Sequence, residues 1–303
     1  MHISVLLQES IDYLNLSEDK KIVDCTLGYA GHSSEILKRI KNGFLFAFDQ
    51  DKEAIEASKS KLNAIASNYD IIFSNFSNIK EELEKRNIDG VDGILYDLGV
   101  SSPQLDQADR GFSFHQDAKL DMRMNQDQKL SAYEVVNEYS ENQLAEIIYK
   151  YGEEKYAKSI AKGIIAARPI KTTLELTEVV KESVPFAYRR EKHPARKTFQ
   201  AIRIEVNNEL ECFKKSLNDA LNLLNIGGRI CVITFHSLED KICKDIFKEK
   251  TEVRKELRNM PIIPKEYQPK FKLVKTLEPT NEELEKNPRA RSAKLRVIER
   301  VWW

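Results

Sequence analysis

Short apolar runs alternate with amphipathic segments along the first hundred residues or so. Strand-length apolar runs stand at 21–24, 43–48, 70–74 and 90–98. Helical spacing of apolar residues is found at 3–14, 35–40, 53–66 and 79–86. Strands that alternate with helices predict an α/β unit around a mostly parallel sheet, and we expect the segment at 3–14 to cover one edge of that sheet.

The pattern changes in the middle of the chain, where no strand is indicated between residues 106 and 207. Helical spacing recurs there at 132–139, 141–149, 154–167 and 174–183. A long helical segment inside an alternating chain predicts an inserted all-helical domain. We therefore expect a core made of residues 1–105 and 208–303, interrupted by an insert at 106–207.

The α/β pattern resumes after the insert. It predicts a helix at 210–224, a strand at 229–235, a helix that Ser237 caps and that extends to about residue 250, and two strands at 271–277 and 295–303. The last two strands predict a terminal β-hairpin, which is not part of a simple dehydrogenase plan.

The turn after the first strand carries the first sign of chemistry. Asp24 ends the strand, and Gly28 and Gly31 follow shortly before a helix begins. Glycines let the backbone approach a ligand, and the first turn of a helix offers unpaired N–H groups. Asp49 ends the second strand about twenty residues later, where a carboxylate suits the hydroxyls of a ribose. This arrangement predicts a bound adenosine, although glycine-rich turns also occur as plain connections.

Three further side chains follow strand ends. Asp97 ends the fourth strand ahead of a loop at 99–103 that contains glycine and proline, and His236 ends the fifth. Phe76 follows the third strand, where its ring suits either an adenine face or the core. Because parallel strands end at one edge of a sheet, we expect these groups near Asp49. A lone histidine is more often structural than catalytic.

The insert combines aromatic and basic residues. Phe112, Phe114 and His115 crowd its first loop beside Arg110. The most basic run of the chain lies at 188–199, with aromatic residues at both ends, and contains Arg189, Arg190, Lys192, Arg196 and Lys197. This composition suits phosphate contacts and base stacking, whereas most charge runs are simply solvated faces.

Bulk composition narrows the class of protein. The 303 residues carry 48 basic and 48 acidic side chains, so any basic surface must be local. Four scattered cysteines form no Cys-x-x-Cys pair, which argues against zinc and disulfide frameworks, and no metal site is predicted. No signal pattern or membrane-length apolar run is apparent, so we expect a cytoplasmic protein that does not contact a membrane.

Several long motifs together resemble the bacterial ribosomal RNA small-subunit methyltransferase H family. The motifs cover essentially the whole chain in the family's order and lie at 24–33, 97–105, 110–114, 120–124, 198–204, 235–240 and 288–296. The resemblance implies a Rossmann-like core that uses S-adenosylmethionine, with a helical insert. It also implies methylation of the exocyclic N4 amine of a cytosine at the decoding site of 16S rRNA, within the small ribosomal subunit.

The resemblance also implies a set of site residues. Cofactor contacts fall on Ala30, Gly31, His32, Asp49, Phe76, Asp97 and Gln104. The sequence departs from the family pattern at three positions: Ala30 replaces a usual glycine, and Gln50 and Lys241 replace common arginines. A methyl group at Ala30 narrows the turn if its φ is positive, so backbone contact there is the weakest assignment.

Asp97 is also the candidate catalytic residue. The lone pair of a cytosine amine is delocalised into the ring, and an acceptor that takes a hydrogen bond from one N–H would localise it. An ordinary aspartate has a pKa near 4 and is ionised at pH 7, so we expect Asp97 to accept this bond. A bound methionine ammonium is a competing partner for Asp97. The target base must leave its stack, and Phe112, Phe114 or His115 could receive it.

Two alternatives come from other functional classes. A dinucleotide oxidoreductase shares the turn and Asp49, but the turn lacks the third glycine of Gly-x-Gly-x-x-Gly. A non-catalytic ribosome-assembly factor would bind RNA through the insert and would have no need of Asp49 and Asp97 at strand ends. The sequence leaves the oligomeric state open.

Overall fold

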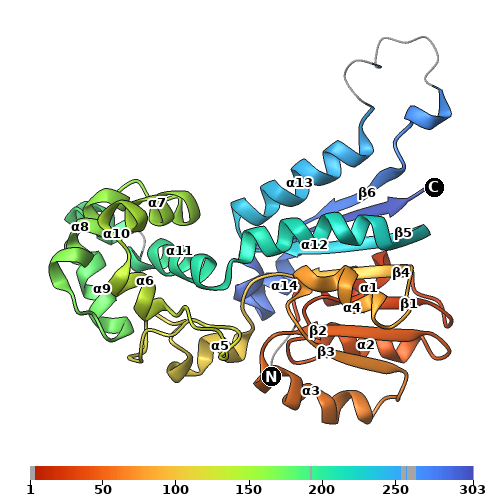
Figure 1. Ribbon diagram of the computed structural model, residues 1–303, viewed down its shortest axis with the longest axis horizontal. Helices are drawn as coiled ribbons and strands as arrows, with labels where there is room; N and C mark the ends of the chain where they lie inside the picture. Colours follow the sequence, from red (N-terminus) through yellow and green to blue (C-terminus); the bar gives the residue numbers. More distant parts are fainter. Residues whose placement is uncertain (1–3, 192, 254–256, 258–263, 303) are drawn as a thin grey trace. The chain divides into compact units, whose positions relative to one another are not determined.

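The chain folds into two units, each of which has its own core. The computed structural model describes residues 4–191, 193–253, 257 and 264–302. One unit comprises residues 1–99 and 210–303, and the other comprises residues 100–209 (Figure 1). The first boundary thus lies after Gly99, because the short helix at 102–106 belongs to the second unit. Within the described residues, no helix is long and apolar enough to cross a membrane.

A seven-stranded sheet forms the centre of the first unit. Its strands are β1 (Lys21–Asp24), β2 (Phe44–Asp49), β3 (Tyr69–Phe73), β4 (Val91–Asp97), β5 (Leu224–Thr234), β6 (Phe271–Leu277) and β7 (Lys294–Arg300), in the order β3-β2-β1-β4-β5-β7-β6. The five strands from β3 to β5 are parallel, whereas β7 is antiparallel to β5 and to β6. The predicted mostly parallel sheet with a terminal antiparallel pair is confirmed.

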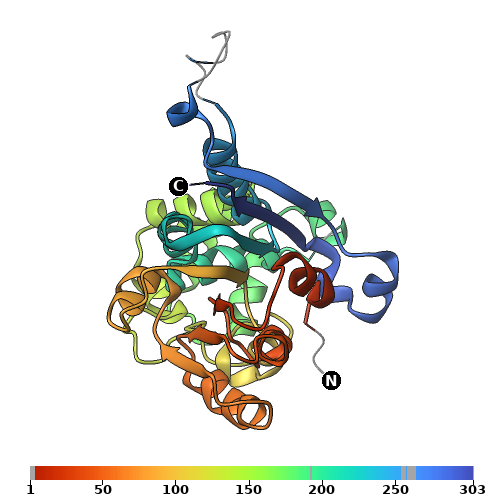
Figure 2. The same ribbon diagram turned by 90° about the vertical axis from the view of Figure 1, so that its right-hand side faces the viewer.

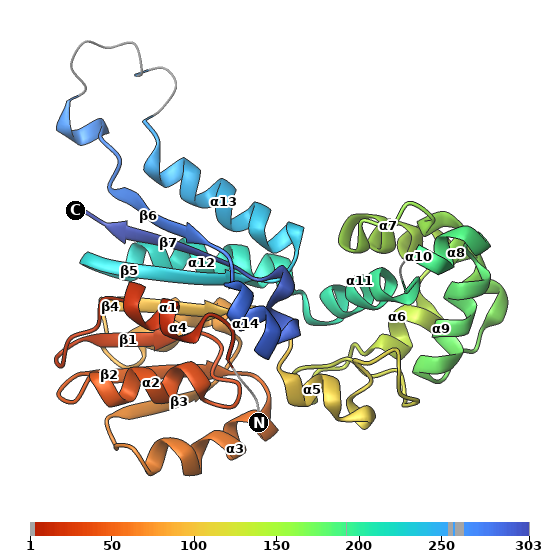
Figure 3. The same cartoon turned by 180° about the vertical axis from the view of Figure 1, so that it is seen from behind.

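Helices cover both faces of this sheet (Figures 1 and 3). They are α1 (Leu7–Tyr13), α2 (Gly31–Arg39), α3 (Lys52–Asn63), α4 (Ile79–Glu84), α12 (Glu209–Leu223), α13 (Ser237–Thr251) and α14 (Asn281–Lys286). Side chains of α4, α12 and α13 share a buried cluster with one face, and those of α1, α2 and α3 share a cluster with the other. Neighbouring strand residues alternate between the clusters, as Ile94 and Leu95 of β4 do.

The second unit is built from helices around an apolar core of its own. They are α5 (Ser102–Asp106), α6 (Ala132–Glu138), α7 (Glu141–Gly152), α8 (Ala157–Ala167), α9 (Thr173–Glu182), α10 (Phe186–Glu191) and α11 (Ala195–Asn207). Its described residues form no strand beyond an isolated bridge between Lys119 and Thr172. An irregular segment lies between α5 and α6, interrupted by a 3-10 turn at Ala108–Arg110.

Three helices of the second unit were missed by the periodicity: the short α5, α10 and α11. α11 begins within the second half of the basic run at 188–199, and α10 ends within its first half. α11 buries apolar residues such as Phe199, Ile202 and Val206, whereas its Arg196 is exposed. The basic residues at the start of this helix masked its apolar face in the sequence.

Candidate active site

The carboxyl edge of the parallel sheet gathers three of the predicted carboxylates. Asp24, Asp49 and Asp97 are the last residues of β1, β2 and β4, which are neighbours in the sheet. Asp97 also pairs in register with Ile233 of β5, so the loop that contains His236 begins at the same edge. Side chains separated by as many as 73 residues in the sequence therefore lie at one edge because their strands are parallel.

Asp24 holds the turn between β1 and α2 together. It is fully buried, and its carboxylate accepts hydrogen bonds from the Thr26 N–H at 3.0 Å and from the Ser33 hydroxyl at 2.6 Å. The Thr26 hydroxyl in turn accepts the Asp97 N–H at 2.8 Å, which ties the turn to the end of β4. Burial raises the pKa of Asp24. Asp24 is therefore a structural carboxylate, and Thr26 and Ser33 are partners that the sequence did not reveal.

Glycine stands at the two positions of this turn for different physical reasons. Gly28 has φ +48°, a left-handed conformation that favours glycine, and a Cβ there would meet only the Thr26 carbonyl, at 3.9 Å. A Cβ on Gly31 would lie 1.8 Å from the Ser4 hydroxyl. The missing Cβ of Gly31 thus makes room for Ser4, and the expectation that it also lets the backbone approach a ligand stays a prediction.

Ala30 has a positive φ, a conformation in which its methyl group is unfavourable. Its φ is +58°, it is fully buried, and it immediately precedes α2. The N–H groups of Gly31, His32 and Ser33 in the first turn of α2 lie before the first intrahelical bond, which the Ser34 N–H donates to the Ala30 carbonyl. This short row of N–H groups suits a carboxylate or another anion.

Asp49 is held by backbone donors and retains acceptor capacity. Oδ2 accepts the Gly28 N–H at 2.8 Å, and Oδ1 accepts the Asp51 N–H at 2.9 Å. The backbone of Gln50 also donates a hydrogen bond to this carboxylate. A carboxylate offers about four acceptor positions, so at least one can still bind a ligand hydroxyl. Burial raises the pKa of Asp49 to about 6, although these N–H groups lower it.

Asp97 lies in surroundings that oppose its charge. Its Oδ2 is 3.5 Å from Nδ1 of the buried His32, and the side chain is one-quarter exposed. Its Oδ1 is buried and accepts no hydrogen bond within the described part of the chain. Burial, together with the nearby carboxylates of Asp24 and Glu239, raises the pKa of Asp97 to about 8. The expectation that Asp97 is ionised at pH 7 with an ordinary pKa is therefore wrong for the ligand-free protein.

Phe76 occupies an intermediate position between core and surface. It begins the 3-10 turn Phe76–Asn78, is partly buried, and meets Tyr96 edge to face, with 5.8 Å between the ring centroids. The Ser216 hydroxyl donates to the Phe76 carbonyl at 2.8 Å, which fixes the backbone there. The ring thus has core contacts, and it also has exposed surface at the carboxyl end of β3.

His236 is the N-cap of α13, in the place predicted for Ser237. Its Nδ1 accepts the Glu239 N–H at 3.5 Å, and its Nε2 lies 3.1 Å from Glu239 Oε1. The buried Glu239 also accepts the N–H of Phe235 at 2.7 Å. Because both ring nitrogens of His236 face Glu239, its role here is structural. The sequence signal for Glu239 is its position three residues after the cap.

Gln104 belongs to the second unit, where it caps a helix. Its side-chain oxygen accepts the Ser101 N–H at 3.0 Å, and the Ser101 hydroxyl accepts the Gln104 N–H at 3.4 Å. This capping box fixes the start of α5, just after the loop at 99–103. Gln104 is thus separated by the unit boundary from the other predicted cofactor residues.

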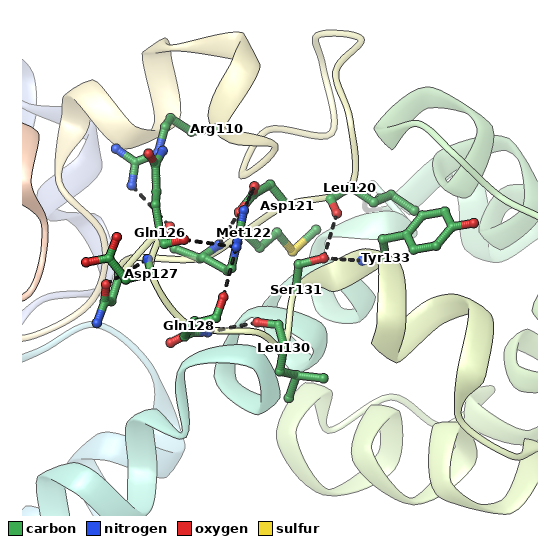
Figure 4. A network of polar contacts seen from close by, with 12 residues as sticks. Arg110, Leu120, Asp121, Met122, Gln126, Asp127, Gln128, Leu130, Ser131 and Tyr133 are labelled. Carbon is green, nitrogen blue, oxygen red and sulfur yellow. Dashed lines mark hydrogen bonds and ion pairs between the residues drawn. The ribbon is translucent and has the colours of Figure 1, made fainter.

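A buried polar network shapes the irregular segment of the second unit (Figure 4). Arg123 pairs with both oxygens of Asp121, and Arg110 donates to the Arg123 carbonyl at 3.1 Å. The Asn207 side chain accepts the Met124 N–H and donates to the Met122 carbonyl, both at 2.8 Å. Motif residues at 110 and 120–124 therefore anchor this segment to the end of α11.

The candidate base-receiving residues are not equivalent. Phe112 is 5 % exposed and belongs to the core of the second unit. The Phe114 ring stacks on His193 with 4.4 Å between the centroids, and it also meets Phe199 at 5.7 Å. His115 is exposed and lies 4.4 Å from Phe114, so of the three it is the residue best placed to meet a base.

The basic run also separates into two groups. Arg189 donates to the Val184 carbonyl at 3.1 Å, and Lys197 donates to the Glu153 carbonyl at 2.6 Å. These bonds satisfy backbone acceptors near the ends of α9 and α7. Arg190 and Arg196 are exposed and make no ion pair within the described residues, and Lys192 lies outside them.

The residues at the carboxyl edge fit an adenosyl cofactor with a cationic group. Asp49 keeps acceptor capacity for a ligand hydroxyl, the first turn of α2 presents N–H groups, and Asp97 Oδ1 accepts no hydrogen bond from the described residues. The neighbours that shift the pKa of Asp97 all raise it, so the site is short of a positive charge. A ligand that carries a ribose, a carboxylate and an ammonium group would satisfy these three features together.

Comparisons with known proteins identify the family of the chain. The model of the MraW methylase family matches residues 1–301. Ribosomal RNA small subunit methyltransferase H of Exiguobacterium sibiricum is 52 % identical over 306 residues, which cover 99 % of this chain and 98 % of that protein. Its counterpart from Mycoplasma capricolum is 55 % identical over 306 residues and 99 % of both chains.

A solved rRNA methylase from Streptococcus thermophilus is also similar, with a TM-score of 0.46 and 11 % identity over 99 % of both chains. The assignment rests on the matches in sequence, which span almost the whole chain at more than half identity. They confirm the resemblance found in the motifs. The chain belongs to the MraW methylase family.

Proposed function

We propose that this protein transfers the methyl group of S-adenosylmethionine to the exocyclic N4 amine of a cytosine at the decoding site of 16S rRNA. Family membership supports methyl transfer, and the names of the relatives support ribosomal RNA of the small subunit as the acceptor. The structural observation that carries the proposal is the edge formed by Asp49 and Asp97, where one carboxylate has spare acceptor positions and the other lacks a cation.

Residues at the carboxyl edge of the first unit would hold the cofactor. Asp49 would accept hydrogen bonds from the ribose hydroxyls, and the N–H groups of Gly31 and His32 would bind the carboxylate at the positive end of α2. The backbone at Ala30 leads into this turn, and the Phe76 ring would lie against the adenine. Gln104, which the family resemblance adds to this set, belongs to the second unit. When bound, S-adenosylmethionine supplies an electrophilic methyl group on a sulfonium centre.

Asp97 binds the ammonium group and becomes ionised as a result. A cation next to a carboxyl group lowers its pKa, so binding reverses the effect of burial and of Asp24 and Glu239. The ionised carboxylate then accepts a hydrogen bond from one N–H of the cytosine amine. That bond would localise the nitrogen lone pair, which makes the amine a better acceptor for the methyl group that the cofactor would supply. His32, 3.5 Å from Oδ2, orients the carboxylate.

The proposal is tested by transfer of an isotopically labelled methyl group from S-adenosylmethionine to naked 16S rRNA and to 30S particles. Mass spectrometry of the digested nucleosides should find the label in N4-methylcytidine from a single site. Label in another nucleoside, or in no nucleoside with either substrate, would contradict the proposal. The comparison of the two substrates tests whether the protein acts on the assembled subunit.

A further inference from the structure

The far edge of the first unit carries a basic and aromatic surface that the proposed site does not use. The surface consists of Lys265, Tyr267, Lys270, Lys275 and Trp302, and we call it the β6 surface. β6 is the outer strand of the sheet, beyond β7 (Figure 2). Tyr267 is 49 % exposed, and the three lysines are exposed.

Trp302 brings two of the lysines together. Its indole Nε1 donates to the Pro269 carbonyl at 3.0 Å, which fixes the ring next to the start of β6. The ammonium groups of Lys265 and Lys270 lie 6.0 Å and 5.8 Å from the centre of that ring. Cation–π attraction holds the two like charges near one ring, so a binding site for a polyanion is prepared before any ligand arrives.

The acidic residues near this strand do not neutralise the surface. Glu299 of β7 pairs with Arg229 and with Lys272, both at 2.8 Å, so its charge is already balanced. Lys265, Lys270 and Lys275 take part in no ion pair within the described part of the chain. The exposed Glu266, between Lys265 and Tyr267, offsets one of these three positive charges, so the surface keeps a net positive charge.

The direction of β6 links the surface to the candidate active site. β6 and β5 are both antiparallel to β7, so β6 runs parallel to β5 and ends at the same edge as Asp97. At about 3.3 Å per residue, the strand covers roughly 20 Å between Trp302 and that edge. A polyanion that lies along β6 would therefore pass from Lys270 to Lys275 toward the carboxyl edge.

We infer that the β6 surface binds the phosphate backbone of the RNA substrate outside the target nucleotide. This inference rests on the proposed function, because it concerns the same RNA. Lysines paired with exposed aromatic side chains are typical of sequence-independent nucleic-acid contacts. Lysines on an edge strand also prevent unwanted strand pairing, which is the alternative reason for their presence.

Charge reversal separates these two reasons. Lys270→Glu with Lys275→Glu keeps the edge charged, so the strand stays protected, but it repels phosphate. We expect the plot of log binding constant against log salt concentration, measured with 16S rRNA by fluorescence anisotropy, to flatten by about 0.7 to 0.9 per lost contact. KM for the RNA should rise, while kcat and S-adenosylmethionine binding by calorimetry stay as in the wild type.

Lys80→Glu with Lys214→Glu is the matched control, since both lysines are exposed residues of α4 and α12 in the same unit. An equal salt slope in the two double variants overturns the inference and leaves edge protection as the reason for the lysines. Failure of the wild type to methylate any rRNA would instead contradict the proposed function.

Discussion

Asp97 shows how burial can prepare a side chain for a charged ligand. A carboxyl group beside two other carboxylates, with one oxygen lacking a donor, is held neutral at pH 7. Ionising it in the ligand-free protein is unfavourable, and a bound cation removes the penalty. The sequence could place Asp97 at a strand end. It could not give the pKa, which depends on Asp24, 73 residues earlier in the chain, and on Glu239, 142 residues later.

The first prediction concerns the proton on Asp97. With a pKa of about 8, about nine-tenths of the molecules carry this proton at pH 7, and binding of the ammonium group should release it. Calorimetry of S-adenosylmethionine binding in buffers of different ionisation enthalpy measures the release directly. Asp97→Asn should release close to one proton fewer than the wild type. Equal release by both proteins would show that Asp97 is already ionised.

The second prediction concerns the pH dependence of cofactor affinity. Asp49 has a pKa of about 6, so its carboxylate is lost as the pH falls through 6, and the affinity that its hydrogen bonds provide is lost with it. As the pH falls from 7 to 6, log Kd for S-adenosylmethionine should rise by about one, because Asp97 becomes harder to ionise. Below pH 6 it should rise by about two for each unit by which the pH falls, because Asp49 is protonated as well.

Asp49→Asn should bind more weakly at pH 7, by about ten- to a hundredfold, and should lose the break at pH 6 while it keeps the shallower slope above it. A break at pH 6 that survives in the variant would assign it to another group.

At the scale of elements, the sequence was most informative where apolar periodicity and strand ends coincide. The strands β1 to β5 and the edge they share follow from short apolar runs that end on Asp24, Asp49 and Asp97. The helix α11 was missed because its first residues are basic, and only its position in the core of the second unit shows its apolar face. Contacts such as Ser4 against Gly31 depend on tertiary packing and have no sequence signal.

The third prediction concerns the exposed arginines of α10 and α11. Arg190 and Arg196 are exposed, whereas Arg189 and Lys197 bind backbone carbonyls. Arg190→Gln with Arg196→Gln should flatten the salt dependence of RNA binding by about 0.7 to 0.9 per phosphate contact. Lys158→Gln with Lys162→Gln removes the same charge from the exposed side of α8 and serves as the control. Identical slopes would assign the basic run to a solvated face.

At the scale of the whole molecule, the two units carry different parts of the proposed activity. The first unit holds the carboxyl edge, with Asp49 and Asp97, and the β6 surface. The second holds Gln104, the network around Arg123 and the exposed side chains of His115, Arg190 and Arg196. The change from alternating strands and helices to helices alone predicted an insert at 106–207, but the boundary at Gly99 follows from the packing of α5 and the loop before it with the second unit.

The central claim is that Asp97 acts on the reacting amine and does more than hold the cofactor. Single-turnover methylation of 16S rRNA, with S-adenosylmethionine and RNA both saturating, separates these roles for the wild type, Asp49→Ala and Asp97→Asn. The account predicts that Asp49→Ala recovers a rate close to that of the wild type, while Asp97→Asn stays slower by about 10² or more. A wild-type rate for saturated Asp97→Asn would contradict it and would leave Asp97 as a binding residue alone.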